Sequence, residues 1–181
     1  YAFSTENWKR PKLEVDTLMT LLATYLSKEI KELHANNVKV TTIGDISKLP
    51  KNCIEQLNNA FELTKDNTGV NLNLALNYGS RDDIKNAIID ILNDAKCGKI
   101  NIEEINENTI KNYLDTKSIP DPDLIIRTSG EQRLSNFLMW EAAYSEFYFT
   151  DIHWPDFNRT ELQKAIYVYQ NRDRRFGGLS K

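Results

Sequence analysis

The feature of this chain that most constrains its fold is a repeated alternation of short apolar runs with longer segments of helical periodicity. Apolar residues recur at helical spacing over residues 14–36, and a compact apolar run follows over 38–43. Pro50 opens a second helical segment, and apolar and polar residues then alternate over 70–76 as in a strand. A third helical segment follows over 84–98. This order predicts an α/β fold with a mostly parallel central sheet flanked by helices, because parallel strands are joined through helical crossovers.

The rest of the chain continues the pattern with shorter elements. One short polar helix is expected within residues 102–117, a buried strand over 124–126 and a last strand over 147–149. A final helix is expected over residues 160–172. Its inward-facing residues are expected to be Leu162, Ala165, Ile166 and Tyr169. At 181 residues, the chain is expected to form a single domain over 1–181.

Charge and composition exclude several classes of function. The net charge of -3 leaves no basic surplus to neutralise a phosphate backbone, so nucleic acid is excluded as the main partner. No segment approaches the roughly 20 apolar residues of a membrane span, and no signal peptide is recognisable. Cys53 and Cys97 are isolated and lack the spacing of metal ligands. A reduced, cytoplasmic protein is therefore expected.

Polar chemistry concentrates in one stretch near the predicted strand 124–126. Arg127 comes directly after this strand, and Arg133 and Ser135 follow a small polar turn. Because ligands of open α/β sheets bind beyond the carboxyl ends of strands, these donors suit a phosphate or diphosphate. Glu146 lies among aromatic residues and would suit a Mg²⁺ that bridges phosphates. From spacing alone, surface ion pairs between the two arginines and neighbouring carboxylates explain the pattern equally well.

Several motifs of the chain resemble one enzyme family. The stretch Ile126-Arg-Thr-Ser-Gly-Glu-Gln-Arg-Leu-Ser-Asn-Phe137, with Tyr144-Ser-Glu-Phe147 and Trp154-Pro-Asp-Phe157, resembles the cis-prenyltransferases of the bacterial undecaprenyl diphosphate synthase type. Three further motifs match the same family in the same order, at residues 1–11, 77–79 and 174–178. The resemblance therefore spans the whole chain.

This resemblance implies a fold and a reaction. The fold is that of the cis-prenyltransferases, assembled as a symmetric homodimer. The reaction is the condensation of isopentenyl diphosphate onto an allylic diphosphate, such as farnesyl diphosphate, with cis stereochemistry and with Mg²⁺ as the cofactor. The product is undecaprenyl diphosphate, the lipid carrier precursor for cell-wall peptidoglycan. Because this product is a lipid, peripheral contact with the inner face of the membrane is expected.

The resemblance also assigns roles to residues. Arg127, Arg133 and Ser135 are expected to hold isopentenyl diphosphate, Arg10 to contact the allylic diphosphate, and Glu146 to coordinate Mg²⁺. The residues implied in catalysis are Asn7, Trp8 and Asn77. The residues implied in substrate binding are Phe3, Ser4, Glu6, Arg10, Arg81, Arg127, Glu131, Arg133, Ser135, Arg175 and Gly177.

Two segments receive special roles from the resemblance. The loop that carries Asn7 and Trp8 is expected to be a mobile flap that closes over substrate and excludes water. The tail that carries Arg175 and Gly177 is expected to reach across the homodimer to the partner's isopentenyl diphosphate.

The chain departs from the family pattern at two points. Relatives begin with an earlier strand and an Asp-Gly-Asn-Gly-Arg phosphate loop whose aspartate is essential, and no such motif occurs in these 181 residues. The chain is therefore expected to be an N-terminally truncated fragment that is inactive by itself. Gln132 stands where other members carry His, and an amide is not a general base near neutral pH. Two alternatives stay open: a non-catalytic accessory subunit of the same fold, and a generic phosphate-binding module.

Overall fold

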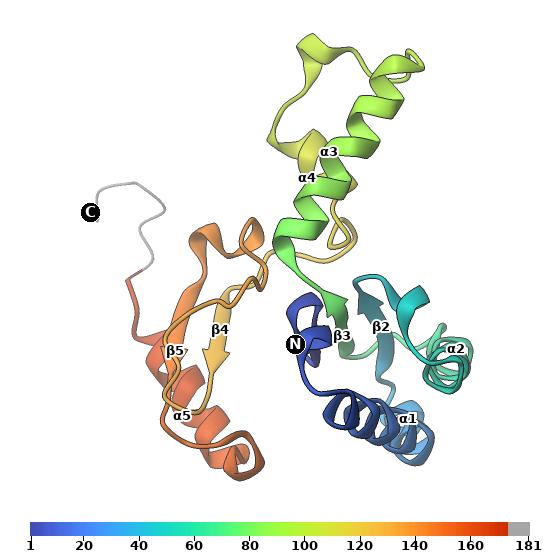
Figure 1. Ribbon diagram of the computed structural model, residues 1–181. Helices are drawn as coiled ribbons and strands as arrows, with labels where there is room; N and C mark the ends of the chain where they lie inside the picture. The colour runs from blue at the N-terminus through green and yellow to red at the C-terminus, as the bar shows by residue number, and fades with distance from the viewer. Residues whose placement is uncertain (174–181) are drawn as a thin grey trace. The chain divides into compact units, whose positions relative to one another are not determined.

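The computed structural model describes residues 1–173 (Figure 1). The chain divides into two compact units, Tyr1–Ser118 and Ile119–Lys181. Every strand pairing in the described residues is parallel, and helices flank the strands of each unit. The predicted α/β class is thereby confirmed. The expectation of one domain over 1–181 stays a prediction.

The first unit is built on a three-stranded parallel sheet with the strand order β1-β3-β2. Its strands are β1 (Phe3–Ser4), β2 (Lys39–Ile43) and β3 (Asn71–Tyr78). The register pairs Lys39 with Asn71 at one end of β2 and Ile43 with Ala75 at the other. The central strand β3 is buried on both faces towards its carboxyl end.

Two helices supply the apolar cover of this sheet. They are α1 (Lys12–Ala35) and α2 (Lys51–Thr64), and each follows directly on a proline, at Pro11 and Pro50. The two helices pack on one another, and Leu57 of α2 is completely buried between them and the sheet. Burying one such leucine contributes about 1.5–3 kcal/mol. The core cluster consists of Phe3, Val15, Met19, Ala23, Leu26, Leu49, Cys53, Leu57 and Leu76.

Helix α3 (Ser80–Lys96) starts immediately after β3 and extends away from the sheet (Figure 1). It packs against α4 (Glu107–Tyr113), which a short 3-10 helix, η3 (Ile102–Glu104), precedes. The short helix predicted within 102–117 corresponds to α4, whereas the separate 3-10 helix η3 was not predicted. The cause is local, because two asparagine side chains, at residues 101 and 106, each accept hydrogen bonds from backbone N–H groups and start a separate helix.

The second unit is built on a two-stranded parallel sheet of β4 (Leu124–Arg127) and β5 (Glu146–Phe149). Helix α5 (Arg159–Gln170) packs against β5. Of its predicted inward residues, Ala165 is fully buried, whereas Leu162 and Ile166 are 42% and 40% exposed. The inward assignment of these two residues is wrong, because two strands offer the helix only a narrow face to pack on.

Short 3-10 helices complete the connections. They are η1 (Thr5–Lys9), η2 (Ile46–Lys48), η4 (Glu141–Tyr144) and η5 (Trp154–Asp156). In the described part of the chain, no helix has the length and apolar character needed to cross a bilayer.

Candidate functional site

The loop after β1 carries several of the predicted site residues and is closed by one of them. The side-chain oxygen of Asn7 accepts a hydrogen bond from the backbone N–H of Ser4 at 2.8 Å. The backbone carbonyl of Asn7 accepts another from the N–H of Arg10 at 3.0 Å. Asn7 therefore ties the beginning of the loop to its end, and Glu6 lies exposed between them.

Trp8 and Asn77 lie 69 residues apart in the sequence and are brought into direct contact. The indole Nε1–H of Trp8 donates to Oδ1 of Asn77 at 2.7 Å, and Nδ2 of Asn77 donates to the backbone carbonyl of Asp45 at 2.8 Å. The ring of Trp8 also meets Phe3 edge to face, with ring centroids 5.0 Å apart. Phe3 itself is buried in the core of the first unit. These two contacts hold the indole between the core and the end of β3.

Two predicted anion-binding arginines of the first unit lie on its surface. Arg10 forms an ion pair with Glu14 at 2.7 Å, and both side chains are about half exposed. An exposed pair of this kind contributes only about 0–1 kcal/mol, so an anion of higher charge would compete with Glu14 effectively. Arg81 is exposed in the first turn of α3, directly after the Asn77-Tyr-Gly79 turn.

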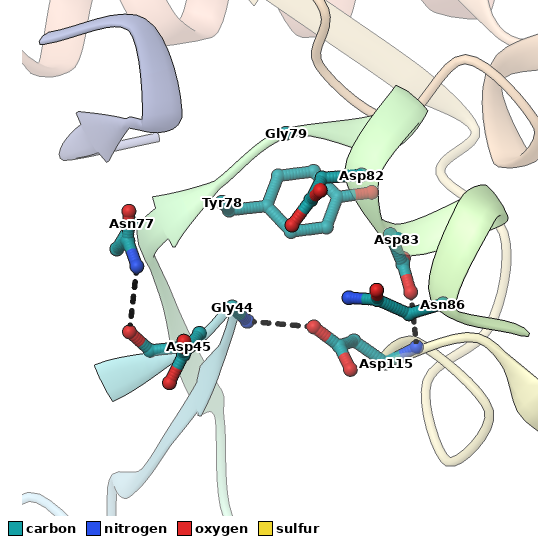
Figure 2. A pocket seen from close by; sticks show the side chains of 9 residues that line it. All are labelled: Gly44, Asp45, Asn77, Tyr78, Gly79, Asp82, Asp83, Asn86 and Asp115. Carbon is teal, nitrogen blue, oxygen red and sulfur yellow. Dashed lines mark hydrogen bonds between the residues drawn. The ribbon is translucent and has the colours of Figure 1, made fainter. Parts of the chain in front are cut away.

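A cavity of about 100 Å³ lies at the carboxyl ends of β2 and β3 (Figure 2). The backbone N–H of Gly44 donates to Oδ2 of Asp115 at 2.9 Å, and the N–H of Asp115 donates to Oδ1 of Asp83 at 3.0 Å. The hydroxyl of Ser47 donates to Asp45 and lowers the pKa of its carboxyl. The sequence prediction missed these aspartates, although the Gly44-Asp45 turn directly after a strand was a usable signal. The cavity is lined by Gly44, Asp45, Asn77, Tyr78, Gly79, Asp82, Asp83, Asn86 and Asp115.

In the second unit, Arg127 at the end of β4 reaches the loop that carries the other predicted phosphate ligands. Its Nη1 donates to the backbone carbonyl of Arg133 at 2.6 Å and to Oγ of Ser135 at 3.0 Å. The guanidinium of Arg133 pairs instead with Glu131, on the surface. The predicted approach of Arg127 to Ser135 is therefore present, whereas the Arg133 side chain is engaged with a neighbouring carboxylate.

The backbone of this loop is unusual. Ser135, Asn136 and Leu138 have positive φ angles of 51°, 64° and 46°, in the region that non-glycine residues rarely adopt. The preceding turn is held by hydrogen bonds from the N–H groups of Ser129 and Gly130 to backbone carbonyls of residues 152 and 150, at 2.9 Å each. The hydroxyl of Ser129 also lies 3.3 Å from Nδ1 of His153, a contact that the sequence prediction did not anticipate.

Glu146 is the first residue of β5 and is partly buried. One carboxylate oxygen lies 3.8 Å from Nε of Arg172. Among residues 1–173, no three His, Cys, Asp or Glu side chains gather as a complete protein-only metal site would require. A Mg²⁺ commonly takes one or two carboxylates and completes its shell with phosphate oxygens and water. A single carboxylate here therefore fits a Mg²⁺ that binds together with a diphosphate.

The remaining predicted site residues are Arg175 and Gly177, which lie outside the described residues. The roles of all the predicted site residues stay predictions.

Comparison with known proteins gives consistent similarities. A family model described as "putative undecaprenyl diphosphate synthase" matches residues 1–177. The isoprenyl transferases of Clostridium tetani and Clostridium perfringens are 62% and 59% identical to the chain over 179 residues. These alignments cover 99% of this chain and 70% and 71% of the two relatives.

Two solved structures share the fold. Lavandulyl diphosphate synthase from Lavandula x intermedia, in complex with dimethylallyl diphosphate, has a TM-score of 0.95 at 38% identity, over 97% of this chain and 76% of that one. A probable undecaprenyl diphosphate synthase from Campylobacter jejuni has a TM-score of 0.86 at 38% identity, over 97% and 80%. The similarity extends across both compact units.

Proposed function

Since the chain belongs to the undecaprenyl diphosphate synthase family of isoprenyl transferases, we propose that it condenses isopentenyl diphosphate onto farnesyl diphosphate with cis stereochemistry. The product is undecaprenyl diphosphate, for use as the precursor of the cell-wall lipid carrier. The protein works as a homodimer in the cytoplasm and releases its lipid product at the inner face of the membrane. The observation that carries the proposal is the hydrogen bond of Arg127, at the end of strand β4, to Ser135 in the loop that follows.

In this proposal, Arg127, Arg133 and Ser135 bind the diphosphate of isopentenyl diphosphate. The two loop contacts of Arg127 both use Nη1, and a guanidinium carries further donors on Nη2 and Nε. Arg133 is exposed and paired with Glu131, a pair that contributes at most about 1 kcal/mol. A diphosphate carries more charge than one carboxylate and would therefore replace Glu131 as the partner of Arg133.

The allylic diphosphate is assigned to residues of the first unit. Arg10 leaves its exposed pair with Glu14 to meet the diphosphate, and Arg81 adds a second cation at the start of α3. Trp8 covers the allylic carbon with an apolar ring, and its hydrogen bond to Asn77 sets the plane of that ring. An apolar cover of this kind shields a developing carbocation from water.

The transfer itself breaks the allylic carbon–oxygen bond, with diphosphate as the leaving group. A carbon–carbon bond forms to isopentenyl diphosphate, which then loses a proton. Bound Mg²⁺, with Glu146 as its protein ligand, would neutralise negative charge on the diphosphates. Gln132 cannot take up the proton, because an amide is not basic near neutral pH.

The proposal is tested by incubating the chain, and a version of it extended upstream, with labelled isopentenyl diphosphate, farnesyl diphosphate and Mg²⁺ and separating the products by chain length. Incorporation into a polyprenyl product of undecaprenyl length is expected from the extended version. Arg127→Lys should lower kcat/KM by about tenfold or more, because lysine cannot reproduce the fork of donors that reaches both the loop and a diphosphate. The matched control is Arg159→Lys, at the exposed start of α5. Absence of incorporation by either version would favour the accessory-subunit alternative.

The similarity to lavandulyl diphosphate synthase supports a second candidate, a transferase that accepts dimethylallyl diphosphate and makes a short product. The same assay separates the two, with dimethylallyl diphosphate replacing farnesyl diphosphate. A short product from dimethylallyl diphosphate, together with no long product from farnesyl diphosphate, would favour the second candidate.

A further inference from the structure

The turn Gly44-Asp45 at the carboxyl end of β2 is held from two sides. On one side the side chain of Asn77 donates to the backbone carbonyl of Asp45 at 2.8 Å. On the other, the carboxylate of Asp115 accepts a hydrogen bond from the backbone N–H of Gly44 at 2.9 Å. Both bonds appear in Figure 2, which shows Asp115 and Asn77 on either side of the turn.

Asn77 can transmit the position of this turn to the loop after β1. It is 4% exposed, and its amide donates to Asp45 while it accepts from the indole of Trp8 at 2.7 Å. One planar amide group makes both bonds, so a shift of the turn rotates the acceptor that Trp8 uses. Asn77 also adopts a φ of 48°, which leaves its backbone little freedom to compensate.

The turn also lies closely against β3. Gly44 has a φ of 96°, and a Cβ atom there would lie 2.2 Å from the backbone carbonyl of Leu76. The bare glycine therefore lies directly against β3, and the bond to Asp115 fixes its N–H. The backbone of Asp115 is held in turn by its N–H bond to Asp83, which is 5% exposed in the first turn of α3.

The cavity beside Asp115 is unsuited to a diphosphate substrate. Its volume is about 100 Å³, whereas ligand pockets usually occupy roughly 300–1,000 Å³. Four aspartates line it, so an anionic ligand would be repelled. The residues around it are better placed to hold the neighbouring turn than to bind substrate.

We infer that Asp115 is a positioning residue, whose carboxylate holds the Gly44-Asp45 turn and, through Asn77, sets the orientation of Trp8. The hydrogen bond, rather than the charge, does this, since the bond is to a neutral backbone N–H. The structural part of the inference stands on these contacts alone. Its consequence for prenyl transfer rests on the proposed function.

The test measures solvent exchange of the indole proton of Trp8. The chain has three tryptophans, so NMR spectra of protein with isotope-labelled tryptophan contain three indole N–H signals, and Trp8→Phe identifies the relevant one. In Asp115→Ala, solvent exchange of the Trp8 indole proton should be about fivefold faster, as expected when one ordinary hydrogen bond is lost. Asp115→Asn should restore slow exchange, because its amide oxygen still accepts from Gly44. Asp66→Ala, an exposed aspartate in the turn after α2, is the control.

Two results would overturn the inference. One is a Trp8 signal that exchanges equally fast in Asp115→Ala and in Asp66→Ala. The other is an Asp115→Asn variant as perturbed as Asp115→Ala, which would point to the charge instead of the bond. Circular dichroism of each variant reports whether it is folded.

A kinetic measurement adds the functional consequence. Asp115→Ala should lower kcat/KM for the allylic substrate by about fivefold, with Asp115→Asn close to the parent protein. If the parent protein extended upstream shows no prenyl transfer, the proposed function fails, while the NMR result still decides the role of Asp115. If transfer is normal in Asp115→Ala although Trp8 is loosened, the link from Trp8 to catalysis is overturned.

Discussion

Replacing Asn77 separates two contributions to the stability of the first unit. Its side chain makes two hydrogen bonds, to Trp8 at 2.7 Å and to Asp45 at 2.8 Å, and its backbone has a φ of 48°. Glycine adopts this backbone conformation without cost, whereas alanine pays roughly 1 kcal/mol or more in the left-handed region. The two variants remove the same hydrogen bonds and differ in backbone strain.

The expected magnitudes follow from these contacts. Each hydrogen bond contributes about 1 kcal/mol net, so Asn77→Gly should lower the free energy of unfolding by about 2 kcal/mol. Asn77→Ala should lower it by about 3 kcal/mol, because the strain adds to the lost bonds. In an ordinary strand position the order is reversed, since glycine there is the more destabilising residue by about 0.5–1 kcal/mol.

Urea unfolding followed by circular dichroism measures both changes as shifts in the transition midpoint at unchanged slope. The control is Asn71→Ala, at the exposed start of the same strand, for which a change within about 0.5 kcal/mol is expected. The reasoning is refuted if Asn77→Ala is as stable as Asn77→Gly, or if both resemble the control.

Three further predictions follow from named contacts. Gly44→Ala should lower the free energy of unfolding in urea by about 3 kcal/mol or more, because the Cβ of alanine would clash with the backbone of β3. Gly98→Ala, at φ 71° with open space around it, should lower it by only about 1 kcal/mol. The pKa of Asp94 is lowered, first by a hydrogen bond from the lysine five residues later. The contribution of Asp94 to the stability of the fold is therefore present above the ordinary pKa of 3.8 and is lost as the pH falls. Asp94→Asn should make the free energy of unfolding depend less on pH in the acid range, and an unchanged pH dependence would contradict this. Burial raises the pKa of the Cys53 thiol, so in native protein a disulfide reagent should modify the exposed Cys97 rapidly and Cys53 only on unfolding, and equal rates would contradict the buried position.

The elements that could be predicted from the sequence are those whose pattern repeats over several residues. Helix α1 has a long apolar period, and polar and apolar residues alternate over the first four residues of β3, so each pattern repeats often enough to be recognised. The segment 102–117 has no such period, and its two helices depend on individual asparagine caps. The inward face of α5 was overestimated because the width of the sheet beneath it is a tertiary property.

In the candidate site, too, contacts between residues close in the sequence could be predicted, whereas contacts between distant residues could not. Arg127 and Ser135 are eight residues apart, so their contact follows from one strand end and one loop. The bond between Gly44 and Asp115 joins residues 71 apart, and neither position has a local signature of it. Such a contact depends on where α4 ends in space, which no short-range pattern encodes. Sequence motifs therefore indicate the side chains that would bind a ligand more readily than the residues that hold those side chains in place.

Both units contain residues with positive φ beside the side chains proposed to meet substrate. In the first unit the residue is Asn77, with a φ of 48°, and in the second the residues include Ser135 and Asn136, at 51° and 64°. Each such residue costs about 1–3 kcal/mol and persists only where other contacts require it. Here those contacts are the bonds of Asn77 to Trp8 and Asp45, and the bond of Arg127 to Ser135. Donors and acceptors fixed in this way need little reorganisation when charge develops nearby, which is the main demand of a reaction that expels a diphosphate.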